Sequence, residues 1–296
     1  MRFGIMGMQV QYLIPAGMVA GSVTAYISAF DHADLARELA SKGFHLIELG
    51  GDLAMFFGRA FDAAAIERLA ALKKEQGISY TVHLPLWSVE PSTPLAAVRQ
   101  GSVRAVSDII RATQPLQPEV YVLHAYGALA AEFFRMPFAE TARTIILQQF
   151  QLGALDSVRK ILAETGIPSR ALAIETIEFP LKMTLALAEM LDLSICFDTG
   201  HVLSGFAGAV DLFDALERCL PRLAEVHLHD APLSHSQDAI EYGKDHRPLG
   251  KGDLDLGRLL DRLQEANFKG PIIFELTVEQ ALSSLEVVRH VRPSLI

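Results

Sequence analysis

Residues 193–201 read Leu-Ser-Ile-Cys-Phe-Asp-Thr-Gly-His, a short apolar run that ends at Asp198, with His201 one turn later. A nearly continuous apolar run of this length is typical of a parallel β-strand that is buried on both faces. A carboxylate at the end of such a strand costs free energy unless a cation or hydrogen bonds compensate it. The stretch therefore predicts a buried strand with a functional polar group at its carboxyl end.

The same pattern recurs along the whole chain, with short apolar runs separated by longer amphipathic segments. We expect strands at residues 3–8, 44–49, 78–83, 120–124, 171–176, 193–198, 225–229 and 271–276. We expect helices at residues 33–41, 63–75, 95–111, 144–164, 181–191, 210–220, 254–266 and 279–289. Asp253 is the expected N-cap of one helix, and Gly43, Gly77 and Gly166 are the expected ends of three others.

Eight strand–helix units in one chain predict an α/β fold, a (β/α)8 TIM barrel whose single domain spans residues 1–296. A doubly wound open sheet is the alternative. The chain lacks the glycine-rich turn after its first strand that a dinucleotide-binding sheet of that kind carries. The barrel is therefore the preferred prediction.

The N-terminal segment carries no charged residue between Arg2 and Asp31. That would also fit a signal peptide or a membrane span. Gln9, Gln11, Pro15 and several glycines interrupt the apolar run, so we expect a cytoplasmic protein with no membrane partner. The two cysteines, Cys196 and Cys219, lie in apolar patterns and are expected to be buried thiols.

The charge of the chain argues against a polyanionic partner. The net charge is −9, and no cluster of lysine and arginine provides a nucleic-acid footprint. We therefore predict no salt-dependent binding to duplex DNA, abasic or intact, at physiological ionic strength. An anisotropy titration with a labelled duplex checks this, and tight binding that weakens with added salt would contradict it.

Polar residues end most of the expected strands, and they are Glu48, His83, His124, Glu175, Asp198, His227 with His229 and Asp230, and Glu275. In a barrel these strand ends meet on the face that carries the active site. Imidazoles and carboxylates without cysteine suit Zn, Mn, Fe or Co, and we expect one to three divalent ions. No lysine ends an expected strand, which argues against Schiff-base chemistry.

Each of these residues also has a structural interpretation. Glu48 fits a salt bridge as well as a substrate contact, and His83 or His124 alone would fit a hydrogen-bonded core histidine. The acidic strand ends would fit an ion-pair network, but no arginine or lysine ends a strand to partner them, which favours metal. Residues 250–252, Gly-Lys-Gly, fit either a phosphate cradle or a plain turn.

These motifs resemble, in order along nearly the whole chain, the xylose isomerase-like superfamily, which includes the endonuclease IV-type barrels of AP endonuclease family 2. The matching segments are residues 82–85, 122–124, 173–176, 197–201, 226–230, 245–252 and 273–275. The resemblance implies that one metal is held by Glu175, Asp198, His227 and Glu275. It implies further metals at His83, His124, His201 and His246.

Two details of this resemblance matter. The family pattern places an acid three residues after the seventh-strand histidine; this acid is Asp230, which favours His227 over His229 as the ligand. The endonuclease IV-type aspartate two residues before the last histidine is Lys244 here, and Asp245 is adjacent instead. A narrower resemblance, to the cobamide-remodelling phosphodiesterase branch, rests on residues 12–16, 80–86, 111–118, 121–124, 192–198 and 243–246.

The resulting hypothesis is an enzyme that hydrolyses a phosphodiester in a small molecule, with a cobamide as one candidate, by means of metal-activated water. The expected catalytic residues are Glu175, Glu275 and His201, and the expected substrate contacts are Glu48, His229, Asp230, Arg247 and Lys251. The alternative is a mononuclear-metal isomerase or epimerase for a sugar or sugar phosphate. A non-catalytic metal-binding module is a third class. The sequence leaves open the metal, the substrate and the oligomeric state, a homodimer included.

Overall fold

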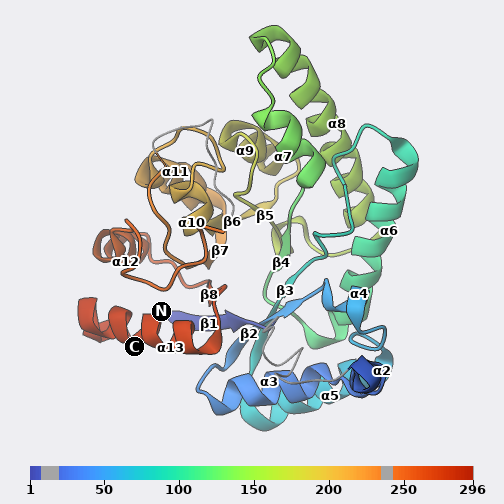
Figure 1. Ribbon diagram of the computed structural model, residues 1–296, viewed down its shortest axis with the longest axis vertical. Coiled ribbons are helices and arrows are strands. Elements are labelled where there is room, and N and C mark those ends of the chain that lie inside the picture. The colour runs from blue at the N-terminus through green and yellow to red at the C-terminus, as the bar shows by residue number, and fades with distance from the viewer. Residues whose placement is uncertain (8–19, 235–242, 296) are drawn as a thin grey trace.

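The computed structural model describes residues 1–7, 20–234 and 243–295. Eight parallel strands pair in sequence order, and β8 pairs with β1 to close a barrel. The strands are β1 (Arg2–Met6), β2 (Leu46–Gly50), β3 (Ser79–His83), β4 (Tyr121–Leu123), β5 (Leu172–Glu175), β6 (Ser194–Asp198), β7 (Leu223–His227) and β8 (Pro271–Phe274). The predicted (β/α)8 barrel is confirmed (Figure 1).

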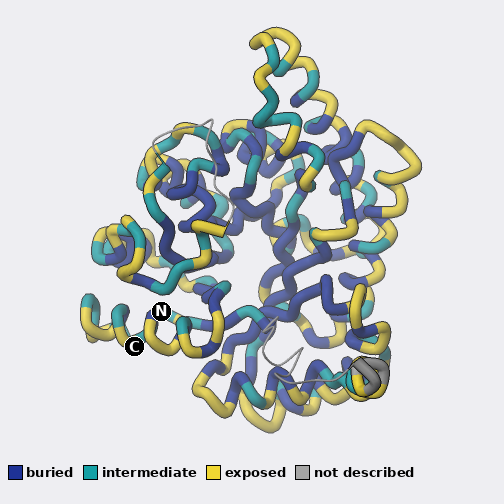
Figure 2. The backbone as a smooth tube through the Cα atoms, viewed as in Figure 1, coloured by how far each residue is buried: buried dark blue, intermediate teal, exposed yellow. Residues whose placement is uncertain are grey.

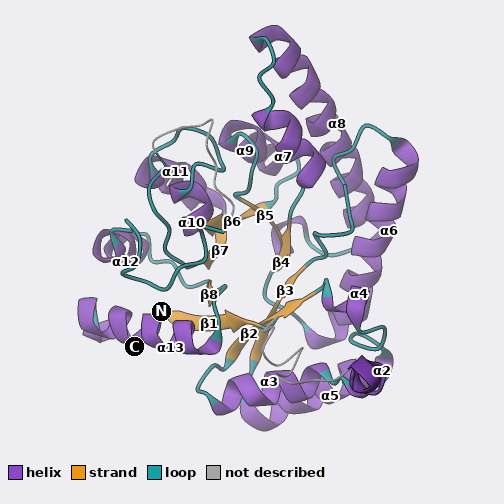
Figure 3. Ribbon diagram, viewed as in Figure 1, coloured by secondary structure: helices purple, strands orange, loops and turns teal. Residues whose placement is uncertain are grey.

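Helices surround the strands, as Figure 3 shows. They are α2 (Ala20–Ala29), α3 (His32–Ser41), α4 (Leu53–Phe56), α5 (Ala63–Gln76), α6 (Ala96–Thr113), α7 (Ala128–Arg135), α8 (Glu140–Thr165), α9 (Leu181–Met190), α10 (Thr199–Leu203), α11 (Leu212–Cys219), α12 (Leu256–Glu265) and α13 (Val278–Val291). Short 3-10 turns are η1 (Gln114–Leu116), η2 (Ser169–Ala171), η3 (Leu220–Arg222) and η4 (Pro293–Leu295). Among the helices in the described ranges, none is both long and apolar enough to cross a membrane.

The core lies between the strands and the inner faces of the helices. Helix α12 illustrates the cause, since Leu256, Leu259, Leu260 and Leu263 recur with the helical period and all four are buried. Burying one such side chain stabilises the fold by about 1.5–3 kcal/mol. Figure 2 shows the resulting pattern, with buried strands inside and exposed helix faces outside. Both cysteines are free and buried, as expected.

Some helix ends follow from the local sequence alone, and others depend on tertiary contacts. Gly77 and Gly166 have left-handed backbones (φ 67°) and end α5 and α8, as predicted. The predicted N-cap at Asp253 is wrong, because the carboxylate of Asp255 accepts the N–H of Arg258 and caps α12. Asp253 lies before the helix, where its carboxylate accepts the N–H of Leu233 in a tertiary contact. Met8, at the end of the first predicted strand, and residues 12–16, which carry part of the narrower resemblance, lie outside the described residues.

Candidate metal centre

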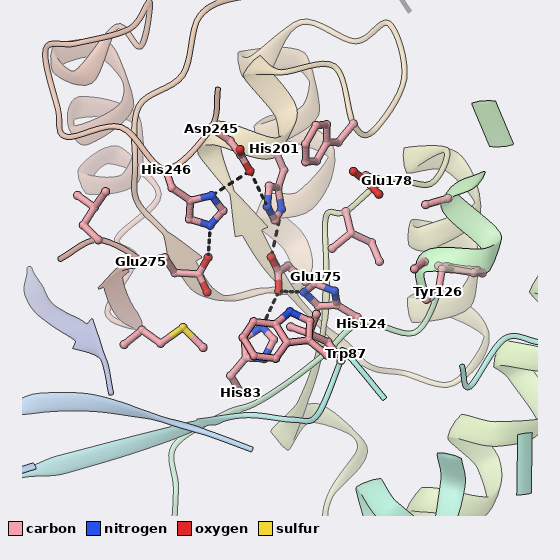
Figure 4. Close-up of a pocket in the computed structure, with 18 of the residues that line it drawn as sticks. His83, Trp87, His124, Tyr126, Glu175, Glu178, His201, Asp245, His246 and Glu275 are labelled. Carbon is pink, nitrogen blue, oxygen red and sulfur yellow. Dashed lines mark hydrogen bonds and ion pairs between the residues drawn. The ribbon is translucent and has the colours of Figure 1, made fainter. Parts of the chain in front are cut away.

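The carboxyl ends of the strands bring the predicted metal ligands together at one rim of the barrel. Figure 4 shows six of them around a common space, His83, His124, Glu175, His201, His246 and Glu275. Asp198 and His227 lie beside them with no exposed surface. Parallel strands make this convergence unavoidable, because every strand ends at the same rim. The adjoining pocket has a volume of about 660 Å³.

Glu175 lies at the centre of the cluster, with its two carboxylate oxygens facing different partners. Oε2 lies 3.2 Å from Nε2 of His83 and 2.8 Å from Nε2 of His124. Oε1 lies 3.2 Å from Nδ1 of His201 and 3.5 Å from Nδ1 of His227. One carboxylate therefore separates two sets of imidazoles.

Glu175, Asp198, His227 and Glu275 form a group in which each side chain offers one ligand atom, all within 4.8 Å of one another. Nδ1 of His227 lies 3.3 Å from Glu275 Oε1 and 3.8 Å from Asp198 Oδ2. Both Nδ1 of His227 and Oε1 of Glu175 are buried, and among the described residues neither atom has a neighbour in hydrogen-bond geometry. Buried unpartnered polar atoms of this kind fit a divalent cation as their missing partner. His83, His124 and Glu175 form a second such group.

The pKa values of two histidines also indicate that the site suits a cation. Burial lowers the pKa of His83, but the neighbouring carboxylate of Glu175 outweighs this and raises the pKa to about 9. Burial also lowers the pKa of His201, and the charges of Asp198 and Glu175 raise it to about 9. Buried imidazoles that hold protons this strongly reveal an excess of negative charge, which a divalent cation compensates.

His229 contacts Asp198 and does not line the pocket, although it also forms a group with His201 and His246 whose possible ligand atoms lie within 4.8 Å of one another. Its Nδ1 accepts the backbone N–H of His246 at 2.9 Å, so its Nε2 carries the proton and donates to Asp198 Oδ2 at 2.9 Å. His229 thus orients a ligand, and the geometry supports His227 as the seventh-strand member of the group. The imidazole of His229 packs on Gly200, where a Cβ would lie 2.1 Å from the ring. This explains the glycine of the Asp-Thr-Gly-His motif.

Asp245 lies in the pocket beside His246 and His201. Its Oδ2 lies 2.9 Å from Nδ1 of His246 and 3.8 Å from Nε2 of His201 (Figure 4). His246 has a left-handed backbone (φ 54°), which allows two adjacent side chains to enter one pocket. In an extended strand they would point to opposite faces. Sequence reasoning noted Asp245 without giving it a role, because this backbone conformation leaves no clear sequence signal.

Glu48 lies beneath the cluster, in the interior of the barrel. It is fully buried, and its Oε2 lies 3.3 Å from Nε2 of His227. It does not line the pocket, so the structure favours the salt bridge over the substrate contact for this residue. Glu225, which sequence reasoning missed, lies 4.0 Å from the same nitrogen and accepts the hydroxyl of Thr81. The sequence could have indicated this position, because residues 225 and 227 are two apart in β7 and therefore point to the same face of the strand.

The loop after β7 is organised by Asp230, whose buried carboxylate accepts five backbone N–H groups at 2.9–3.1 Å. The donors are the N–H groups of Ala231, Gly250, Lys251, Gly252 and Leu254. The N–H groups of residues 250–252 therefore bind a carboxylate of their own chain, so the plain turn is right and the phosphate cradle is wrong.

The structure does not bring Asp230, Arg247 or Lys251 to the pocket wall, so it gives no support to their predicted substrate contacts. Arg247 pairs its backbone with Asp230, and its side chain donates to the carbonyl of Lys251. Lys251 itself is exposed. These residues build the loop that presents Asp245 and His246.

We expect Asp230→Ala to lower the free energy of unfolding by about 3 kcal/mol or more, because five backbone N–H groups lose one buried, charged acceptor at once. Urea denaturation measures the change. Asp253→Ala is the matched control, since that exposed carboxylate accepts a single N–H from the same region and should behave as wild type. An Asp230→Ala variant as stable as the control would show that the loop does not depend on this carboxylate.

Comparisons with known proteins agree with this architecture. An uncharacterised protein of Methanocaldococcus jannaschii is 21% identical over an alignment of 235 residues that covers 76% of this chain and 74% of that protein. A D-tagatose 3-epimerase-like protein of known structure superposes with a TM-score of 0.71 at 18% identity, covering 98% of this chain and 97% of the other. Endonuclease IV from Thermus thermophilus gives a TM-score of 0.65 at 20% identity, covering 98% of each chain.

At these identities the structural likeness shows the shared fold. The family assignment rests on a different finding, the match of residues 36–292 to the family model of the xylose isomerase-like TIM barrel. That match covers most of the 296 residues and includes every strand from β2 to β8. This chain therefore belongs to the xylose isomerase-like TIM barrel family.

Proposed function

We propose that this protein is a divalent-metal-dependent hydrolase that cleaves a phosphodiester in a small molecule, with a cobamide as the narrower candidate. One observation carries the proposal, namely that the two oxygens of Glu175 face different sets of imidazoles. A carboxylate between two ligand sets suits enzymes that hold two cations about 3.5–4 Å apart. A mononuclear isomerase does not need His83 and His124 as ligands.

In this proposal the strand-end ligands hold the metal ions, and the residues that line the pocket transfer protons. Glu175, Asp198, His227 and Glu275 would hold one ion, and His83 and His124 would share Glu175 in holding another. When bound, these ions supply Lewis acidity toward a phosphoryl oxygen and lower the pKa of water.

The pocket residues supply the proton transfers. His201 lines the pocket with its Nε2 3.8 Å from Asp245 Oδ2, a position from which it can give a proton to the oxygen that leaves a cleaved diester. Glu275 accepts a hydrogen bond from Nε2 of His246 at 3.1 Å, while its other oxygen faces His227. It thus links a ligand set to the pocket wall.

A sugar or sugar-phosphate isomerase or epimerase is the second candidate. Glu175 and Glu275 belong to the same four-residue group, and two carboxylates in one site can remove and return a proton at carbon. In this alternative a single ion holds the sugar oxygens, and His201 orients the substrate. A similar solved structure is named a D-tagatose 3-epimerase-like protein, which gives this candidate its additional support.

The test is to count metals and measure turnover on the same preparation. Protein purified without chelator is analysed for its metals and assayed on bis(4-nitrophenyl) phosphate, on a cobamide and on ketose sugars. The proposal expects two or more ions per chain and hydrolysis of a diester. One ion per chain with epimerisation of a ketose would replace it by the second candidate.

A further inference from the structure

The pocket beside the metal centre is larger and more apolar than the centre alone requires. Its volume of about 660 Å³ lies within the range that encloses drug-sized ligands, about 300–1,000 Å³. Away from the histidines and carboxylates, its wall consists largely of apolar and aromatic side chains, among them Leu86, Trp87, Tyr126, Ile177, Phe206 and Leu276. This wall faces the part of a substrate that does not react.

Trp87 is the exposed member of this wall. It lies four residues after His83, and its side chain is 57% exposed although it lines the pocket. The backbone around it is fixed, because the N–H groups of Leu86 and Trp87 donate to the buried carboxylate of Asp52 at 3.0 and 3.2 Å. An anchored backbone that presents a large exposed indole beside a polar site suits a stacking surface.

A second aromatic ring extends this surface. Phe56 packs edge-on against Trp87 with ring centroids 6.1 Å apart, and it is half-exposed as well. Figure 4 shows Trp87 among the labelled pocket residues, on the side of the site that carries His83 and His124. Phe56 is the last residue of α4, which follows β2, and Trp87 lies on the loop that follows β3, on the side of the proposed second ion.

The charged side chains of the pocket wall indicate which class of ligand the wall can bind. Among the pocket-lining residues in the described part of the chain there is no lysine or arginine, and Glu178 and Asp245 add negative charge. Arg135 lies near the pocket but pairs with Glu178 at 3.7 Å. Away from the histidines, the described part of the wall therefore offers no lysine or arginine to an anionic group, and it suits a neutral one.

We propose that the wall at Trp87 binds a neutral aromatic or heteroaromatic ring of the substrate, joined to the phosphodiester that reacts at the metal centre. This rests on the proposed function, and it names the substrate class as an aryl- or base-bearing phosphodiester. Stacking of a flat ring on an aromatic side chain changes affinity by about tenfold or more.

Trp87 is the single tryptophan of the chain, so its fluorescence reports directly on this site. The metal-loaded protein is titrated with diphenyl phosphate and with diethyl phosphate, which carry the same charge and differ in their rings. We expect saturable quenching by diphenyl phosphate and at least tenfold weaker binding of diethyl phosphate. Equal affinity for the two diesters, or no change in fluorescence, would overturn the proposal.

Variants separate stacking from a structural effect. By calorimetry, Trp87→Ala should weaken diphenyl phosphate about tenfold and leave diethyl phosphate unchanged, and Trp87→Phe should restore most of the affinity. Leu152→Ala is the matched control, since Leu152 is also 57% exposed and lies on α8 away from the pocket. Loss of both diesters in Trp87→Ala would overturn the stacking role.

The two proposals can fail separately. Ring-dependent binding at Trp87 without hydrolysis of any diester would refute the hydrolase and leave the aromatic site in place. Hydrolysis that is indifferent to the ring and to Trp87 would refute the aromatic site alone.

Discussion

Replacing His83 and His124 together by alanine is expected to remove one equivalent of divalent metal and to leave the ion near Asp198 in place. The reason is the position of Glu175, whose Oε2 faces these two histidines while Oε1 faces His201 and His227. Hydrolysis of a phosphodiester should fall about a thousandfold, because an ion of this kind contributes several kcal/mol to the transition state. Elemental analysis and turnover on bis(4-nitrophenyl) phosphate measure both effects.

The matched control is a second double variant, His45→Ala with His290→Ala, which removes two exposed histidines away from the pocket. It should keep the metal content and the activity of the wild type. If the protein is an isomerase, the His83/His124 variant keeps its single ion and loses only substrate affinity. One ion per chain in both the wild type and this variant would end the hydrolase proposal.

Asp198→Ala and Glu275→Ala are expected to lose the central ion and nearly all activity while the barrel stays folded. Both side chains belong to the four-residue group around Nδ1 of His227, and both lie at the rim, outside the packed apolar core. Glu275→Ala should be the milder change for the fold. Asp198→Ala also removes the cap of α10 and the acceptor of His229, which costs about 1–3 kcal/mol.

Elemental analysis and circular dichroism on the same samples test this expectation. Glu178→Ala serves as the control, because that carboxylate lines the same pocket and is outside the metal-binding groups. It should retain its metal. Full metal occupancy in Asp198→Ala or in Glu275→Ala would remove these residues from the centre.

The barrel could be predicted from the sequence because its signals are local. Each strand is a short apolar run, and each helix such as α12 repeats its leucines with the period of one helical face. The strand ends could be predicted as a site for a related reason. Once eight parallel strands close a barrel, residues such as His83, Glu175 and Asp198 must meet at one rim, however far apart they are in the chain.

Several features of the site could not be predicted because they depend on backbone turns and on partners distant in sequence. Asp230 accepts N–H groups from residues about twenty positions further on, so a residue expected to touch substrate holds a loop. Asp245 reaches the pocket through the left-handed backbone of His246. Trp87 becomes a pocket wall because Asp52 holds the preceding loop.

The sequence by itself determined the barrel, the order of its strands and the set of imidazoles and carboxylates at their ends, because periodicity and strand direction decide these. Only the tertiary structure decided which oxygen of Glu175 faces which histidines, and that His229 orients Asp198 while His227 faces the other ligands. Such choices depend on side-chain rotamers and on hydrogen bonds between distant segments. Those are fixed only when the whole rim packs together.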